Sequence, residues 1–137
     1  MGSGPPTTER KELVKEEDRA RYRHEVVSLG KRLEGAEEQT VWEVYATTEK
    51  LIAVLKLRLD YETPGVFTTL PDASDPAKLI KDAAELLSSA AQQIGEGKLV
   101  DSIGTLRKAR NNLRSYLTEK KRSVARTQRK ARSKPSV

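Results

Sequence analysis

The chain of 137 residues has a modest apolar content of 36% and a high charged content of 34%, so it can bury only a small core. It has no cysteine and one histidine, which excludes disulfides, a cysteine nucleophile and a zinc site built from thiolates or several histidines. The net charge of +6 is unevenly spread: residues 107–137 hold 12 Lys or Arg and one acid, whereas residues 1–106 hold 14 basic and 19 acidic residues. A mildly acidic body therefore precedes a strongly basic C-terminal segment.

No apolar stretch approaches the roughly 20 residues needed to cross a bilayer, and no apolar signal segment follows Met1. We therefore expect no membrane insertion and no secretion by a visible signal peptide. The aromatic content of 4% provides no stacking platform of the kind that single-strand binders use.

The first predicted helix covers residues 9–33 and follows a Gly- and Pro-rich lead-in at residues 1–8, where Thr7 or Thr8 is the expected cap. Its apolar residues recur every three or four positions only in the second half, which is the part expected to dock on a neighbour. Gly35 is expected to end this helix.

The second predicted helix covers residues 37–61 and carries the strongest apolar stripe of the chain. Trp42, Val54 and Leu57 widen that stripe, so this helix is expected to have neighbours on more than one side. Thr63-Pro64-Gly65 is expected to stop it. The connection that follows, at residues 66–73, has no partner strand and is predicted to be a loop.

Asp75 and Pro76 form a strong helix start, with an aspartate cap and proline at the first helical position, and they predict a third helix to about residue 94. Gly95-Glu96-Gly97 is the predicted turn into a fourth helix that begins at Lys98. Its apolar seam, which matches the third helix as an antiparallel hairpin, ends at Leu117. The chain beyond this point is therefore expected to project from the bundle.

These elements predict an all-α protein: a small bundle of two helical hairpins, at residues 9–117, with a long basic C-terminal helix or arm. We call residues 118–137 the basic arm. The arm has no helix-breaking residue before Pro135, and it is expected to be helical when a partner neutralises its charge and frayed otherwise.

The arm is the main candidate site. Its cations are suited to neutralising successive phosphates and releasing counterions, which makes binding strong and salt-dependent. The alternatives are an acidic protein or membrane surface, or a solubilising tail without a partner, although the lack of Leu, Phe or Trp after Leu117 argues against membrane insertion. The candidate nucleic-acid-binding residues are Lys120, Lys121, Arg122, Arg126, Arg129, Lys130, Arg132 and Lys134.

Two further groups of arginines are weaker candidates. Arg107, Arg110 and Arg114 lie opposite the seam of the fourth helix, where they either extend the surface of the arm or pair with acids of the bundle. Arg19, Arg21 and Arg23 lie among acidic residues, so a salt-bridged helix surface and a second polyanion contact are both open.

An enzyme is not expected. Gly95-Glu96-Gly97-Lys98 lacks the first glycine, the Ser or Thr and the preceding strand of a phosphate-binding loop. A single histidine and scattered carboxylates offer no catalytic constellation. We therefore predict no cofactor, no metal and no small-molecule substrate.

A small cysteine-free four-helix chain with a basic extension resembles the α-helical major coat proteins of filamentous double-stranded DNA viruses of archaea. The resemblance implies a structural protein that coats duplex DNA without sequence specificity, assembles into homo- or hetero-oligomers or filaments, and is found in the virion or inside the cell. It would place residues 120–134 against phosphate, with Arg19, Arg21 and Arg23 as a second contact. The rival functions are a small RNA- or ribosome-associated basic protein and a helical adaptor with a basic targeting tail.

Overall fold

The computed structural model describes residues 15–62 and 70–133, with side chains as far as residue 129. Within these residues the fold is all-α without strands, as the sequence predicts: α2 (Glu16–Arg32), α3 (Glu38–Arg58), α4 (Pro76–Gly95) and α5 (Leu99–Ser133). The predicted first helix over residues 9–33 does not run continuously, because Lys15 is extended with φ of −65° and ψ of 155° and α2 begins at Glu16. The expected cap at Thr7 or Thr8, Thr63-Pro64-Gly65 and half of the loop predicted at 66–73 lie outside the described residues.

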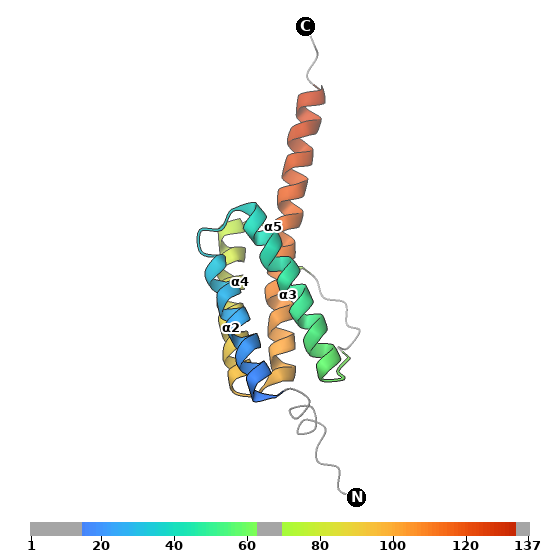
Figure 1. Ribbon diagram of the computed structural model, residues 1–137. Coiled ribbons are helices and arrows are strands. Elements are labelled where there is room, and N and C mark those ends of the chain that lie inside the picture. Colours follow the sequence, from blue (N-terminus) through green and yellow to red (C-terminus); the bar gives the residue numbers. More distant parts are fainter. Residues whose placement is uncertain (1–14, 63–69, 134–137) are drawn as a thin grey trace, which may run out of the picture.

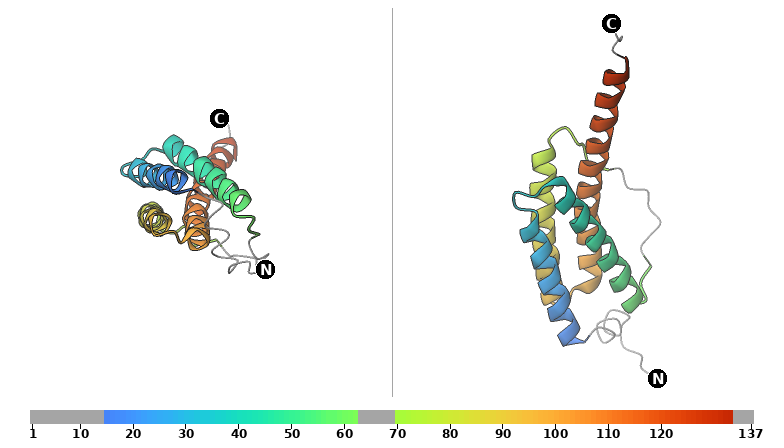
Figure 2. Two further views of the ribbon diagram at one scale, coloured as in Figure 1. Left: turned by 60° about the horizontal axis from the view of Figure 1, so that its bottom comes forward. Right: turned by 45° about the horizontal axis from the view of Figure 1, so that its top comes forward.

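The four helices form two layers, with α2 and α3 on one side and α4 and α5 on the other (Figures 1 and 2). In Figure 1, α2 and α5 run upward, whereas α3 and α4 run downward. The most extensive packing is between α4 and α5, followed by α2 on α4 and α3 on α5, while α2 and α3 touch each other much less. The predicted α4–α5 hairpin is thus the centre of the bundle, and each N-terminal helix rests on one of its members.

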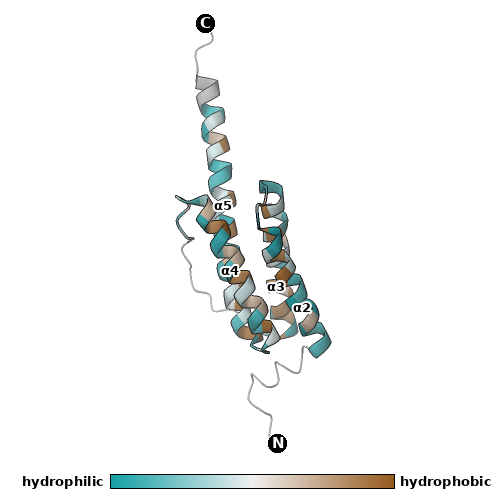
Figure 3. Cartoon of the chain, turned by 90° about the vertical axis from the view of Figure 1, so that its left-hand side faces the viewer, coloured by the Kyte–Doolittle hydropathy of each residue, from teal (hydrophilic) through white to brown (hydrophobic). Residues whose placement is uncertain are grey.

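One continuous core lies between the two layers. Val26 of α2, Leu55 of α3, Leu87 of α4 and Leu106 of α5 each have no exposed surface. Because these residues recur at helical spacing, each helix buries one stripe and leaves its charged residues on the other side. In Figure 3 apolar colour is concentrated in the bundle, whereas the projecting end of α5 is mostly hydrophilic.

The end of α3 differs from the prediction. The helix stops at Arg58, before the predicted limit of residue 61, because Asp60 adopts a left-handed conformation with φ of 48°. The amide of Tyr61 then donates to the carbonyl of Lys56 at 2.9 Å, the 6→1 bond of a Schellman motif. Aspartate tolerates this conformation better than most residues, which explains why a helix can end here without glycine.

The ends of α4 follow the prediction. Asp75 accepts a hydrogen bond from the amide of Lys78 at 3.2 Å, and Pro76 occupies the first helical position. The pKa of Lys78 lies above its ordinary value because its ammonium donates to Asp82. After Gly95 the chain turns at Gly97, whose φ of 79° favours glycine, and enters α5.

α5 extends well beyond its partners. Leu117 is its last buried residue, which confirms that the apolar seam ends there, and the helix nevertheless continues to Ser133. Residues 118–133 span about 24 Å at about 1.5 Å per residue. Because residues 99–117 are already fixed by packing, the arm extends an existing helix and avoids the cost of nucleation. The arm is therefore rooted rigidly in the bundle (Figure 1).

Candidate nucleic-acid interface

The described cations of the arm are directed to solvent along the projecting part of α5. Lys121, Arg122, Arg126 and Arg129 are exposed, and Lys120 is half-buried with its ammonium 5.5 Å from the centre of the Tyr116 ring. Of the other predicted residues of the arm, Lys130 and Arg132 have a described helical backbone only, and Lys134 lies outside the described residues.

A groove of about 910 Å³ lies where the arm leaves the bundle, between α5 and the chain segment that leads into α4. Three arginines from one side of α5, Arg107, Arg114 and Arg122, line it. The remaining lining residues are Leu70, Pro71, Asp72, Ala73, Ser74, Arg110, Asn111, Ser115, Thr118 and Glu119. We call this feature the cationic groove.

The wall of the cationic groove opposite α5 is held in place by side-chain hydrogen bonds. The buried hydroxyl of Ser115 donates to the carbonyl of Pro71 at 2.7 Å and ties the segment to α5. Ser74 donates from its amide and its hydroxyl to the two carboxylate oxygens of Asp72, at 3.2 and 2.7 Å. These bonds occupy the carboxylate of Asp72 and give the groove a defined wall.

The cationic groove continues into the arm. Arg107, Arg114, Arg122 and Arg129 follow one another at intervals of seven or eight residues, which keeps all four within a sector of about 80° on a helix with 3.6 residues per turn. They form a line of positive charge about 33 Å long, from the rise of 22 residues. A polyanion can therefore contact the arm and the bundle at the same time.

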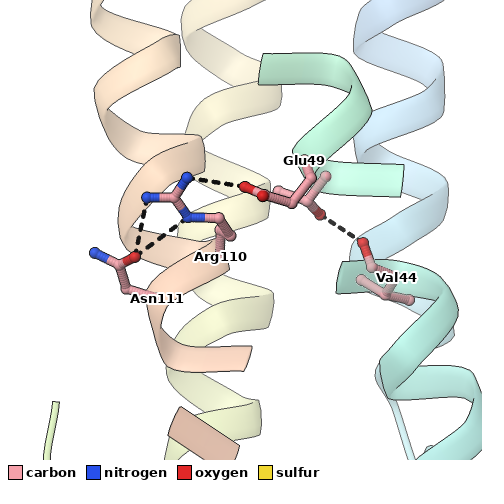
Figure 4. Close-up of polar contacts among 5 residues, drawn as sticks. Val44, Glu49, Arg110 and Asn111 are labelled. Carbon is pink, nitrogen blue, oxygen red and sulfur yellow. Dashed lines mark hydrogen bonds and ion pairs between the residues drawn. The ribbon is translucent and has the colours of Figure 1, made fainter. Parts of the chain in front are cut away.

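Arg110, unlike Arg107 and Arg114, forms an ion pair with a described residue of the bundle. Its guanidinium donates to Glu49 of α3 at 2.8 Å and to Asn111 at 3.1 and 3.2 Å, and its side chain is only 21% exposed (Figure 4). The pair links α3 to α5 and stabilises the bundle. Of the two interpretations open for Arg110, the ion pair within the bundle is the one that the structure contains.

A matched pair of substitutions separates these roles. Arg110→Gln is expected to lower the free energy of unfolding by about 1 kcal/mol, the upper range for a partly exposed ion pair, and to leave the salt dependence of DNA binding unchanged. Arg114→Gln, at an exposed position, should leave stability unchanged and lower the salt slope by about 0.9, one phosphate contact. Urea unfolding and salt titration measure both quantities. A lower salt slope in Arg110→Gln together with a lower stability in Arg114→Gln would contradict these two roles.

The second predicted patch lies at the opposite end of the bundle from the arm, beside the α4–α5 turn. Arg19 and Arg23 of α2 lie against this turn: a side chain added at Gly97 would meet the Arg19 guanidinium at 3.0 Å, and one at Gly95 would meet Arg23 at 3.3 Å. Arg21 pairs with Asp18 at 3.5 Å.

Cations beside the C-terminus of α4 are favoured by the helix dipole, which gives Arg19 and Arg23 a role within the bundle. The structure therefore does not bring the second patch together with the arm. The two lie about 30 Å apart, from the rise of about 20 residues of α5. A contact between these arginines and a polyanion stays a prediction.

Glu119 is the only acidic residue of the arm. Its carboxylate forms an ion pair with the guanidinium of Arg126, with 2.7 Å between nitrogen and oxygen. Glu119→Gln is expected to release Arg126 and to tighten DNA binding by up to about tenfold near 0.1 M salt, with a salt slope larger by about 0.9. Glu96→Gln is the matched control, because Glu96 lies at the other end of α5, 3.9 Å from Lys98. An equal gain in both variants would show that only net charge matters.

The sequence matches no known protein family, and no curated protein or solved structure shows significant similarity to it. None of the described helices is long and apolar enough to cross a membrane. Within the same residues, no group of three or more His, Asp or Glu side chains is placed to hold a metal ion. The described fold and site thus define an all-α bundle with a cationic helical extension.

Sequence reasoning found the cations but not the groove. Ser74, Asp72 and Ser115 shape the groove, and they come from a connection and from a buried helix position. No sequence signal marked them, because the path of an irregular segment across a bundle depends on which helix it meets.

Proposed function

We propose that this protein is a structural nucleic-acid-binding protein that coats or packages duplex DNA without sequence specificity and self-assembles on it. The arm and the cationic groove form the DNA-binding surface, and the bundle supplies contacts between subunits. This proposal covers the coat- or nucleocapsid-like role that the sequence resemblance implies.

One observation carries the proposal: the described part of the arm is a projecting helix with exposed cations, and its line of arginines continues into the cationic groove. A solubilising tail would not need a helix rooted in the core or a line of charge that crosses from arm to bundle. Adjacent cations on an isolated helix repel one another, and bound phosphates relieve that repulsion. Ligand binding and helix stability therefore support each other in the arm.

Duplex DNA fits this surface better than an unpaired strand. A helix about 10–12 Å across fits the major groove, which is about 12 Å wide. Single-strand binders stack bases on aromatic rings, and no aromatic residue lines the cationic groove among the described residues. The arm offers mainly Lys and Arg side chains suited to phosphates, which favours binding independent of sequence.

The test is a salt-dependent titration of the full chain and of a chain truncated after Leu117, on duplex DNA and on structured RNA. We expect the full chain to bind duplex DNA of unrelated sequences with similar affinity and a steep salt slope. The truncated chain should fold and lose nearly all binding, because Leu117 is the last buried residue of α5.

The rivals give different results in the same experiment. Structured RNA that outcompetes duplex DNA at equal salt would favour an RNA- or ribosome-associated protein. A truncated chain that keeps a protein partner while the full chain shows no steep salt dependence on nucleic acid would favour an adaptor with a targeting tail. Either outcome would contradict the packaging function.

A further inference from the structure

The outer side of α3 is an apolar strip that no other described residue of the chain covers. Trp42 is 46% exposed and Leu57 is 82% exposed, and the smaller Ala46 and Ala53 between them are also exposed. All four lie on the side of α3 opposite its buried residues. Only one other large hydrophobic residue is exposed in the described part of the chain, Val124 in the arm.

The sequence predicted neighbours on more than one side of this helix, and residues 15–62 and 70–133 supply neighbours on only one. α2 and α5 cover the buried side of α3, and Trp42 makes a ring contact only with Tyr45 of the same helix, edge to face at 6.0 Å. Exposed apolar residues gathered on one face mark an interaction surface more often than isolated ones do. A partner for this strip must therefore come from outside the described residues.

We propose that a second copy of this chain covers the strip, with the two α3 helices packed antiparallel across a two-fold axis. The charges beside the strip carry this inference. On one edge Glu43 and Lys50 lie seven residues apart, with Ala46 near their midpoint, and on the other edge Glu49 and Lys56 repeat the pattern around Ala53.

A two-fold crossing centred on either alanine is self-complementary. In such a crossing the same edge of both helices meets, so the glutamate of each copy lies beside the lysine of the other, twice per interface. Alanine at the crossing point lets the two backbones approach closely, and the large apolar residue four positions away packs beside it. If each edge of the strip carried charges of one sign only, the same crossing would bring like charges together.

The existing ion pairs of the strip are compatible with this contact. Glu43 pairs with Arg32 and Glu49 with Arg110, and the two glutamate side chains remain 49% and 43% exposed. A polyanion is a poor occupant because these acids flank the strip. None of the residues of the strip lines the cationic groove, and among the described residues the two features meet only at the ion pair between Glu49 and Arg110.

This inference rests on the self-assembly part of the proposed function. Its test uses protein without nucleic acid, so that a failure of the α3 dimer can be distinguished from a failure of DNA binding. Sedimentation is measured over a wide range of protein concentration for the native chain and for Trp42→Glu, Leu57→Glu and Val124→Glu. We expect a dimer whose dissociation constant rises at least tenfold in Trp42→Glu for a crossing at Ala46, or in Leu57→Glu for a crossing at Ala53, and is unchanged in Val124→Glu. The emission of Trp42, the single tryptophan, should shift to the blue as the native dimer forms.

Engineered cysteines test the geometry directly, because the chain has no cysteine of its own. Under mild oxidation, either Ala46→Cys or Ala53→Cys should form a disulfide-linked dimer much faster than Ala20→Cys, an exposed position on α2. Native protein that stays monomeric at every concentration would overturn the inference. So would a dimer that both Trp42→Glu and Leu57→Glu leave intact, or one in which neither alanine position cross-links faster than Ala20→Cys.

Discussion

Replacing Lys121, Arg122 and Arg129, three exposed cations of the arm, together by glutamine is expected to weaken duplex DNA binding by two to three orders of magnitude near 0.1 M salt. Each phosphate contact contributes about 0.9 to the slope of log affinity against log salt, so losing three should lower the slope by about 2.7. The loss should be similar for unrelated DNA sequences, because phosphates carry no sequence information. Fluorescence anisotropy at several salt concentrations measures both the affinity and the slope.

A second triple variant separates the position of the charge from its amount. Lys31, Lys81 and Lys98 are exposed on the bundle, and their replacement by glutamine lowers the net charge equally. This control should retain most of the affinity and nearly all of the salt slope. If the two triple variants bind alike, or if the slope of the arm variant does not fall, the arm is not at the phosphates.

Leu113→Ala is expected to destabilise the bundle by about 2–5 kcal/mol. Leu113 has no exposed surface and lies in the part of α5 that packs on the rest of the bundle, so the substitution removes apolar contacts and leaves a cavity. Urea unfolding followed by circular dichroism should show a lower midpoint with an unchanged slope.

Val124→Ala is the matched control on the same helix. Val124 is 53% exposed and lies in the arm beyond the last buried residue, so its truncation should change the free energy of unfolding by less than about 0.5 kcal/mol. A large loss at Val124 would mean that the arm packs on something in the free protein. A small loss at Leu113 would mean that the seam of α5 is not the centre of the core.

A helical arm rooted in the core has consequences for assembly. Because α5 is continuous from Leu99 to Ser133, the direction of the arm is set by the packing of α5 against α3 and α4. If two copies pair through α3, their arms take fixed relative positions, and both copies can engage one duplex. Linked binding of this kind raises the overall affinity without new contacts.

Much of the bundle was predictable from local patterns. Asp75 with Pro76 and Gly97 mark the ends of α4, and both signals depend on chemistry within a few residues. The end of the apolar seam at Leu117 was equally predictable, because the regular spacing of large apolar residues stops there. The end of α3 was misplaced, since Asp60 in a left-handed conformation leaves a weaker signal than Gly or Pro.

The all-α class, the positions of the helices and the separation of a basic arm from an acidic body follow from local sequence patterns, because helical periodicity and charge are properties of neighbouring residues. Which arginines remain available depends on the packing of the helices. This packing pairs Arg110 with Glu49, places Arg19 against the α4–α5 turn and gathers Arg107, Arg114 and Arg122 along one groove. These arginines are chemically alike, and their different environments arise from contacts between segments far apart in the chain.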